Sequence, residues 1–255
     1  MRKLVYLLII AASVTLTGCF DTVQETTINE DGTGIYITSS DLSVVLGLVK
    51  NMGGEDFSSG MPAKMDTTIN LGEAIDAMND LSEEEKQLIG EGTASIKMDM
   101  KNDTLVMGLK LPFDKLADVS KLSVISGKLI ANLLELGIGS EDSGGGTNMD
   151  EMGIPKASSF DEYMITSYTE SSITRKIDEQ KYKQAANDEF LKGLREATAM
   201  GIESKLTCVY NLPRPATTVK GENITLSEDR MKVTSSFTIN EFFDEPSKLG
   251  FTVEY

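Results

Sequence analysis

Residues 94–136 read ASIKMDMKNDTLVMGLKLPFDKLADVSKLSVISGKLIANLLEL, and they contain both kinds of element that a mixed fold needs. Apolar residues alternate with polar ones from Ala94 to Met100 and again from Leu105 to Leu111, which is the period of a half-buried strand. Lys101-Asn102-Asp103 separates the two runs and is typical of a hairpin turn. The stretch therefore predicts an antiparallel hairpin with one buried face.

The same stretch changes to helical periodicity after Pro112, which we expect to end the strand. Residues 113–136 then predict one long helix that lies on the sheet. Gly127 is a poor helix former, so a break is predicted near Lys121 or Gly127. The apolar stripe of this helix consists of Leu122, Ile125, Leu129, Leu133 and Leu136, with Ile130 and Leu134 beside it.

On the amino-terminal side, a hairpin is expected around the turn at residues 29–32, because β-branched runs flank an Asp-Gly pair. Ser40 can cap a following helix that Gly53-Gly54 ends. Residues 53–68 are rich in Gly, Ser and Met and predict a loop. Two capping boxes, Asn70 with Glu73 and Ser82 with Glu85, then predict the starts of two short helices.

On the carboxyl-terminal side, residues 137–158 contain three successive glycines among acidic residues and predict a flexible loop. The remaining segments read as hairpins, one helix and single strands. They are a hairpin at 163–168 and 173–177, a helix at 179–200, a strand at 204–212, a hairpin at 219–226 and 230–239, and a strand at 251–255. The predicted class is α+β, with a twisted antiparallel sheet of hairpins and about four helices packed mainly on one face.

The first twenty residues, MRKLVYLLIIAASVTLTGCF, predict a secretory signal. Arg2 and Lys3 precede an apolar run from Leu4 to Leu16 that is too short to span a bilayer comfortably. The end of the segment, Leu16-Thr17-Gly18-Cys19, resembles the lipobox of bacterial lipoproteins. The resemblance implies that residues 1–18 are removed and that Cys19 carries acyl chains such as palmitate on its sulfur and amino group. The alternative is an ordinary secretory signal with a chance cysteine. Either way, residues 19–255 are expected to form a single domain.

A second resemblance lies near the end of the chain, in Tyr210-Asn211-Leu212-Pro213-Arg214-Pro215 and the segment that follows it. Val219, Asn223, Leu226-Ser227-Glu228-Asp229 and Val233 complete the pattern. It is similar to the ending of uncharacterised lipoproteins of Bacteroidetes-type bacteria. Together with Cys19 and the strands around Asp31-Gly32, it also resembles the LppM-type lipoprotein domain. That resemblance implies a glycolipid ligand and brings no catalytic residues with it.

Composition excludes several classes of function. The full chain has a net charge of −16, and loss of the two basic residues in 1–18 would leave −18, so nucleic-acid binding is not expected. The chain has no histidine, so it has no Ser-His-Asp triad and no imidazole ligand for a metal. Counting an EF-hand from Gly32 puts Thr27 and Thr38 where carboxylates are required. No metal or other cofactor is therefore predicted.

Cys208 lies in an alternating run and is expected in the core.

We therefore expect a non-enzymatic lipoprotein of the cell envelope, structural or binding, anchored to a membrane through Cys19 with no identified ligand. The outer membrane is the expected location, facing the periplasm or the surface. One alternative is lipid or glycolipid binding in an apolar cavity between sheet and long helix. Its lining, which could equally be plain core, would be Met98, Met100, Met107, Leu122, Ile125, Leu129 and Leu133. A further alternative is a carboxylate-dependent polysaccharide hydrolase that uses two of Asp161, Glu162, Glu170 and Asp178.

Overall fold

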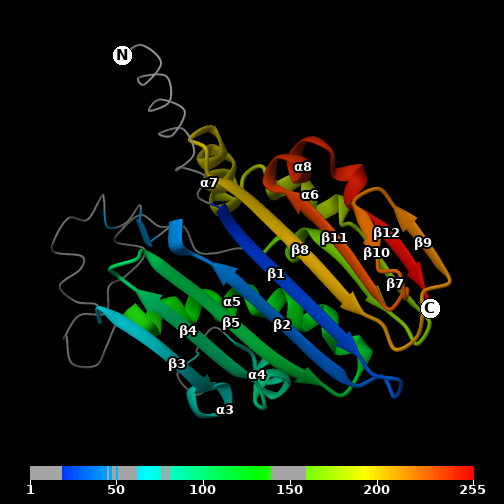
Figure 1. The fold of residues 1–255 in the computed structure, drawn as a ribbon, viewed down its shortest axis with the longest axis horizontal. Helices are drawn as coiled ribbons and strands as arrows, with labels where there is room; N and C mark the ends of the chain where they lie inside the picture. The colour runs from blue at the N-terminus through cyan, green and yellow to red at the C-terminus, as the bar shows by residue number, and fades with distance from the viewer. Residues whose placement is uncertain are drawn as a thin grey trace, which may run out of the picture.

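The computed structural model describes residues 19–44, 46–47, 50, 62–75, 78, 81–138 and 159–255. The predicted signal of residues 1–18 and nearly all of the predicted loop at 137–158 lie outside the described residues. The described chain forms twelve strands in two sheets, with helices packed between and over them (Figure 1).

The larger sheet has eight strands in the order β10-β11-β8-β1-β2-β5-β4-β3. Neighbouring strands are antiparallel except β1 and β8, which are parallel. The first strand of the described chain is therefore interior to the sheet, with partners on both sides. The strands are β1 (Cys19–Ile28), β2 (Gly34–Asp41), β3 (Lys64–Asn70), β4 (Thr93–Asp99), β5 (Thr104–Phe113), β8 (Glu203–Asn211), β10 (Ile224–Leu226) and β11 (Lys232–Thr238).

The smaller sheet has four antiparallel strands in the order β6-β7-β12-β9, and the sequence did not predict that it is separate. Its strands are β6 (Met164–Tyr168), β7 (Ser172–Ile177), β12 (Phe251–Glu254) and β9 (Thr218–Gly221). The predicted strand 219–226 divides here, because the chain leaves β9 at Gly221 and enters β10 in the larger sheet. Gly221 has a φ of +149°, and a Cβ there would lie 2.8 Å from the Cβ of Phe251. Only glycine fits this change of sheet.

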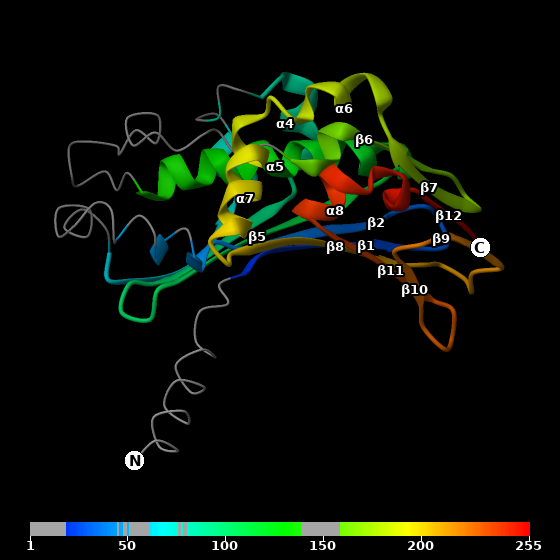
Figure 2. The same ribbon diagram turned by 90° about the horizontal axis from the view of Figure 1, so that it is seen from above.

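The helices are α3 (Leu71–Ala74), α4 (Glu83–Ile89), α5 (Leu116–Ile138), α6 (Glu179–Ala185), α7 (Glu189–Ala199) and α8 (Ile239–Asp244), with 3₁₀ turns η3 (Phe160–Tyr163) and η4 (Pro246–Leu249). Figure 2 shows α4, α5, α6, α7 and α8 on the same side of the larger sheet. Together with the antiparallel hairpins, this confirms the predicted α+β class.

Part of the hydrophobic core lies between α5 and the larger sheet. Leu122 and Leu129 of α5 have no exposed surface, and Leu111 of β5 has none either. Burial of each such side chain contributes about 1.5–3 kcal/mol to folding. The predicted break in this helix is wrong, because α5 is continuous from Leu116 to Ile138. A Cβ on Gly127 would lie 3.0 Å from the Cβ of Ser159, so the glycine permits a close approach between two segments.

Three predicted boundaries differ from the structure near β2 and β5. Ser40 belongs to β2, and Asp41 accepts the hydrogen bond from the backbone N–H of Ser43 where helical residues begin. Residues 64–70 form β3, an edge strand, instead of the end of a loop. Pro112 lies inside β5, at a level where β4 no longer pairs with that strand. Proline is tolerated where a strand has a neighbour on one side alone.

The predicted helix 179–200 is two helices, α6 and α7, because Asp188 starts a new one by accepting a hydrogen bond from the N–H of Leu191. The hydroxyl of Tyr163 also donates to Asp188 at 2.6 Å and holds the break in place. The box at Asn70 is incomplete, since Asn70 accepts from Gly72 but Glu73 does not reciprocate, and α3 spans four residues. The second box, at α4, is confirmed.

That box provides a pH-dependent test. Ser82 and Glu85 each accept from the other's backbone N–H, and Lys128 donates to Glu85 at 2.8 Å. The hydrogen bond from Lys128 lowers the pKa of Glu85 most, and the hydrogen bond from the backbone N–H of Ser82 lowers it further. Ionised Glu85 therefore stabilises the folded state fully at pH values above its pKa in the unfolded chain. This stabilisation is lost as the pH falls through the lower pKa that Glu85 has in the folded state. Glu85→Gln should reduce the free energy of unfolding by about 1 kcal/mol at pH 7, and urea titrations should show a smaller deficit at pH 3.

The matched control is Glu84→Gln, whose side chain is 71% exposed beside an exposed lysine and should have little effect at either pH. An equal deficit for Glu85→Gln at both pH values would show that its charge does not stabilise α4.

Candidate functional site

Strand β1 is an interior strand of the larger sheet, and its two ends mark two opposite ends of the molecule. It begins at Cys19, opposite Glu203 at the start of β8, and it ends at Ile28 beside the β1–β2 turn. At the usual rise per residue, these ends are about 30 Å apart. The end of α7 lies at the Cys19 end (Figure 1), so the molecule has a Cys19 end and a turn end.

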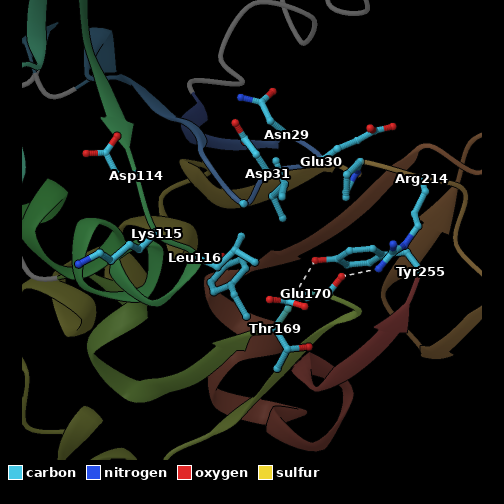
Figure 3. Close-up of a pocket in the computed structure, with 14 residues that line it drawn as sticks. Asn29, Glu30, Asp31, Asp114, Lys115, Leu116, Thr169, Glu170, Arg214 and Tyr255 are labelled. Carbon is cyan, nitrogen blue, oxygen red and sulfur yellow. Dashed lines mark hydrogen bonds between the residues drawn. The ribbon is translucent and has the colours of Figure 1, made fainter.

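A cleft of about 690 Å³ opens at the turn end, and its size suits a small-molecule ligand. Five separate segments line it, which are 28–32, 114–116, 168–170, 213–214 and Tyr255. Figure 3 shows the β1–β2 turn on one side and Thr169 and Glu170 on the other. The cleft is therefore built from the connections between strands that the two sheets bring together.

The lining of this cleft is polar and carries both signs of charge. Arg214 donates to the backbone oxygen of Glu170 at 2.6 Å, and its guanidinium lies 5.7 Å from the centre of the Tyr255 ring. The Tyr255 hydroxyl donates to the backbone oxygen of Thr169 at 2.9 Å. Asp31 accepts from both the hydroxyl and the N–H of Thr33, and these bonds lower the pKa of its carboxyl group. The charged lining residues are Glu30, Asp31, Asp114, Lys115, Glu170 and Arg214.

A buried polar cluster lies between the two sheets. Arg175 of β7 and Asp161 of η3 form a salt bridge of 3.0 Å, with side chains 2% and 4% exposed. Gln24 of β1 donates to the second oxygen of Asp161 at 2.6 Å, and Arg175 also donates to the sulfur of Cys208 at 2.9 Å. Both charged groups therefore have hydrogen-bonded partners, and of these atoms the Nε of Arg175 alone is buried without one.

The space inside this cluster is about 10 Å³, which is the size of one water molecule and excludes a larger ligand. Tyr168 lines both this space and the cleft. This residue therefore borders both the open site and the buried charges. Burial raises the pKa of Tyr168, so its hydroxyl stays protonated near neutral pH.

The seven residues predicted to line a lipid cavity all pack in or against the core. Six are buried, and Met100 is partly buried against the same cluster. Met98 and Met107 come from the hairpin of β4 and β5, and the leucines come from the inward face of α5. The cleft and the small space described above are lined by other residues. We therefore interpret these side chains as core, and lipid binding between them stays a prediction.

The four acids predicted for a hydrolase have different structural roles, and one of them lines the cleft. Asp161 is ion-paired in the buried cluster, and Glu162 caps η3 by accepting from the N–H of Ser159. Asp178 caps α6, and Glu170 lines the cleft. The cleft contains three other acids, which are Glu30 and Asp31 of the β1–β2 turn and Asp114 after β5. The turn and Asp114 are far apart in the sequence, so no local spacing marks these acids as one group.

The two cysteines differ in position. Cys19 is the first residue of β1 and lies directly after the predicted signal segment. Cys208 is 2% exposed, and burial raises the pKa of its thiol, which disfavours the reactive thiolate. This agrees with the predicted core position of Cys208.

Within the described ranges, no three His, Cys, Asp or Glu side chains are grouped so that they could hold a metal ion. No helix in that part of the chain has the length and hydropathy of a membrane span.

Comparisons with known proteins find one distant likeness. No protein-family model matches the chain, and no curated protein matches it significantly. The solved structure of the folded domain of LppM from Mycobacterium tuberculosis is similar at 11% identity and a TM-score of 0.35, over 94% of this chain and 92% of that chain. The predicted resemblance to the LppM-type domain thus has a distant structural counterpart and no more. The resemblance to Bacteroidetes lipoproteins stays a prediction, and function has to be inferred from the geometry of this chain.

The core interpretation of α5 can be tested by overfilling it. Leu129 has no exposed surface, so Leu129→Trp should force neighbouring side chains apart and reduce the free energy of unfolding by about 1–3 kcal/mol. Lys121→Trp, on the exposed side of the same helix, is the control and should have little effect. Unchanged urea unfolding of Leu129→Trp would instead indicate an internal cavity.

The buried salt bridge provides a second test. Asp161→Asn keeps the shape of the side chain but leaves the Arg175 charge unpaired, so it should reduce the free energy of unfolding by about 3 kcal/mol or more in urea titrations. Asp244→Asn removes the partner of Arg195 from a pair that is 48% and 57% exposed, and should reduce it by less than about 1 kcal/mol.

Replacement of the whole pair separates charge from packing. The double variant Asp161→Leu/Arg175→Met should be less destabilised than Asp161→Asn, because it leaves no unpaired charge in the interior. If the double variant instead has a lower free energy of unfolding than Asp161→Asn, the ion pair itself stabilises the fold.

Proposed function

We propose that this chain is a non-enzymatic lipoprotein of the bacterial cell envelope, attached to a membrane through acyl chains on Cys19. The observation that carries the proposal is that the lipobox cysteine is also the first residue of β1, an interior strand of the larger sheet. Cleavage before Cys19 would keep every described residue of β1 in the mature chain. The predicted processing site therefore lies directly before the first described pair of β1 and β8, Cys19 opposite Glu203.

This arrangement gives the proposed lipoprotein a direction. The acyl chains emerge at the Cys19 end of β1, and the polar cleft lies about 30 Å away at the turn end. With no linker between anchor and strand, the cleft faces the aqueous compartment. Its mixed charges suit a polar solute or a polar segment of another protein better than a lipid tail.

A binding or structural role is favoured over catalysis. Of the four acids considered for polysaccharide hydrolysis, one lines the cleft and the other three have structural partners. The chain contains no histidine to act as a general base. The outer membrane is the proposed location, and acylation provides the attachment, because a net charge of −16 would oppose binding to anionic headgroups.

Anchoring is tested by Cys19→Ser in the full precursor. The variant should lose the mass of the acyl chains and move from the membrane fraction to the soluble fraction, as measured by mass spectrometry and cell fractionation. Cys208→Ala is the matched control, because this buried cysteine should not affect acylation. Cys19→Ser protein that remains in the membrane fraction to the same extent as the wild type would contradict the proposal.

A further inference from the structure

We propose that the turn between α7 and β8 docks on the lipid bilayer beside the acylated cysteine, with the Met200 side chain inserted between lipids. This proposal rests on the proposed function, because it assumes that acyl chains hold Cys19 at the membrane. It adds a second contact, which fixes how the domain stands on the membrane.

The position of the turn follows from the parallel pairing of β1 and β8. Cys19 lies opposite Glu203, and Met200 precedes Glu203 by three residues. Both strands start at the same end of the sheet, beside the end of α7 (Figure 1). Any membrane that receives acyl chains from Cys19 therefore lies next to this turn.

The turn is held in a defined conformation. Gly201 has a φ of +87°, and its N–H donates to the backbone oxygen of Thr198 at 3.0 Å. The N–H of Ile202 donates to the backbone oxygen of Ala197 at 3.1 Å. These bonds end α7 as a glycine-containing helix stop. Met200 is thus presented on a fixed backbone instead of a loose loop.

Met200 is exposed to an unusual degree. Its side chain is 71% exposed, whereas the other large exposed hydrophobic residues of the described chain, Val23, Ile37 and Ile165, are between 38% and 41% exposed. Methionine is flexible and apolar, which suits insertion into irregular lipid packing. The most exposed large apolar residue in the described part therefore lies beside the proposed anchor.

The charge pattern also favours lipid contact at this turn. Residues 198–202, Thr-Ala-Met-Gly-Ile, contain no charged side chain, although a quarter of the whole chain is charged. Insertion of this turn would therefore not require desolvation of a charge. One methionine is too small to hold a protein on a membrane, so the acyl chains provide attachment and the turn provides orientation.

The absence of tryptophan from the chain makes a direct test possible. Met200→Trp introduces a single reporter, and the mature acylated protein would be reconstituted into phosphatidylethanolamine–phosphatidylglycerol vesicles with brominated acyl chains. We expect the indole emission of this variant to fall about twofold or more relative to unbrominated vesicles, with a blue shift, because the ring enters the region that holds the bromine atoms.

The matched control is Ile37→Trp. Ile37 is 38% exposed and lies opposite Glu25, six residues along β1 from Cys19 or about 20 Å from the anchor end, so its emission should be unaffected by bromine. Equal emission of Met200→Trp in brominated and plain vesicles would overturn the proposal. So would stronger quenching of Ile37→Trp, which would mean that the sheet face lies on the membrane.

Two further measurements distinguish failure of the docking proposal from failure of the proposed function. Flotation of the same samples with vesicles reports the anchor alone. If the wild type floats but the emission of Met200→Trp is not quenched, the docking proposal fails and the proposed function stands. If the wild type carries no acyl mass and does not float, the proposed function fails and the docking proposal fails with it. A blue shift of Met200→Trp that grows with protein concentration without vesicles would show that a second copy covers the turn, which also overturns the proposal.

Discussion

The first strand of the described chain lies inside the larger sheet, hydrogen-bonded to β2 on one side and to β8 on the other. Without it, the sheet would divide into a three-stranded piece with β8, β11 and β10 and a four-stranded piece with β2, β5, β4 and β3. Cys19, the residue that the proposed lipobox would mark for acylation, is the first described residue of this strand. A force applied to the proposed anchor would therefore act on the middle of the sheet and not on a dispensable tail.

The inward side of β1 is polar where it meets the smaller sheet, and this explains the buried charges. Gln24 of β1 is hydrogen-bonded to Asp161, which pairs with Arg175 of β7. The cluster thus joins the larger sheet, η3 and the smaller sheet at one point. An ion pair in an interior contributes little net stability compared with apolar packing, but another alignment of the two sheets would leave these charges unpaired. We interpret the cluster as the feature that sets how the sheets meet, and hence the shape of the cleft beside it.

Local patterns predicted the elements that depend on local chemistry. The hairpin at 94–111 follows from alternation, the start of α4 from its capping box, and α5 from its leucine stripe. The parallel pairing of β1 with β8 has no such signal, because Gln24 and Cys208 meet across 184 residues of chain. Arg175 lies on the same face of its strand as Ile173, and the sequence does not reveal its buried partner, since alternation shows that a face is buried and not what it is buried against.

The candidate site was less predictable than the fold for the same reason. Its charged residues occupy connections that are unremarkable when read singly, and they converge because two sheets bring five segments together. Gly221 shows the limit at a single residue. Its positive φ allows the chain to change sheets, whereas the sequence around it reads as one continuous strand. The anchor, in contrast, is proposed from the sequence, because the lipobox that residues 16–19 resemble is a short linear motif.

Native-state hydrogen exchange of the mature acylated protein in detergent micelles tests most directly whether β1 is an integral part of the domain. The measurement compares the opening free energies of amides in β1, around Gln24 and Thr26, with those in β8, around Cys208 and Tyr210. We predict that the most protected amides of both strands exchange through the same global unfolding, because neither strand can open without breaking the sheet at its centre. Exchange of the β1 amides at a clearly lower free energy, while β8 and β11 remain protected, would show that the strand detaches from the domain and would contradict this account.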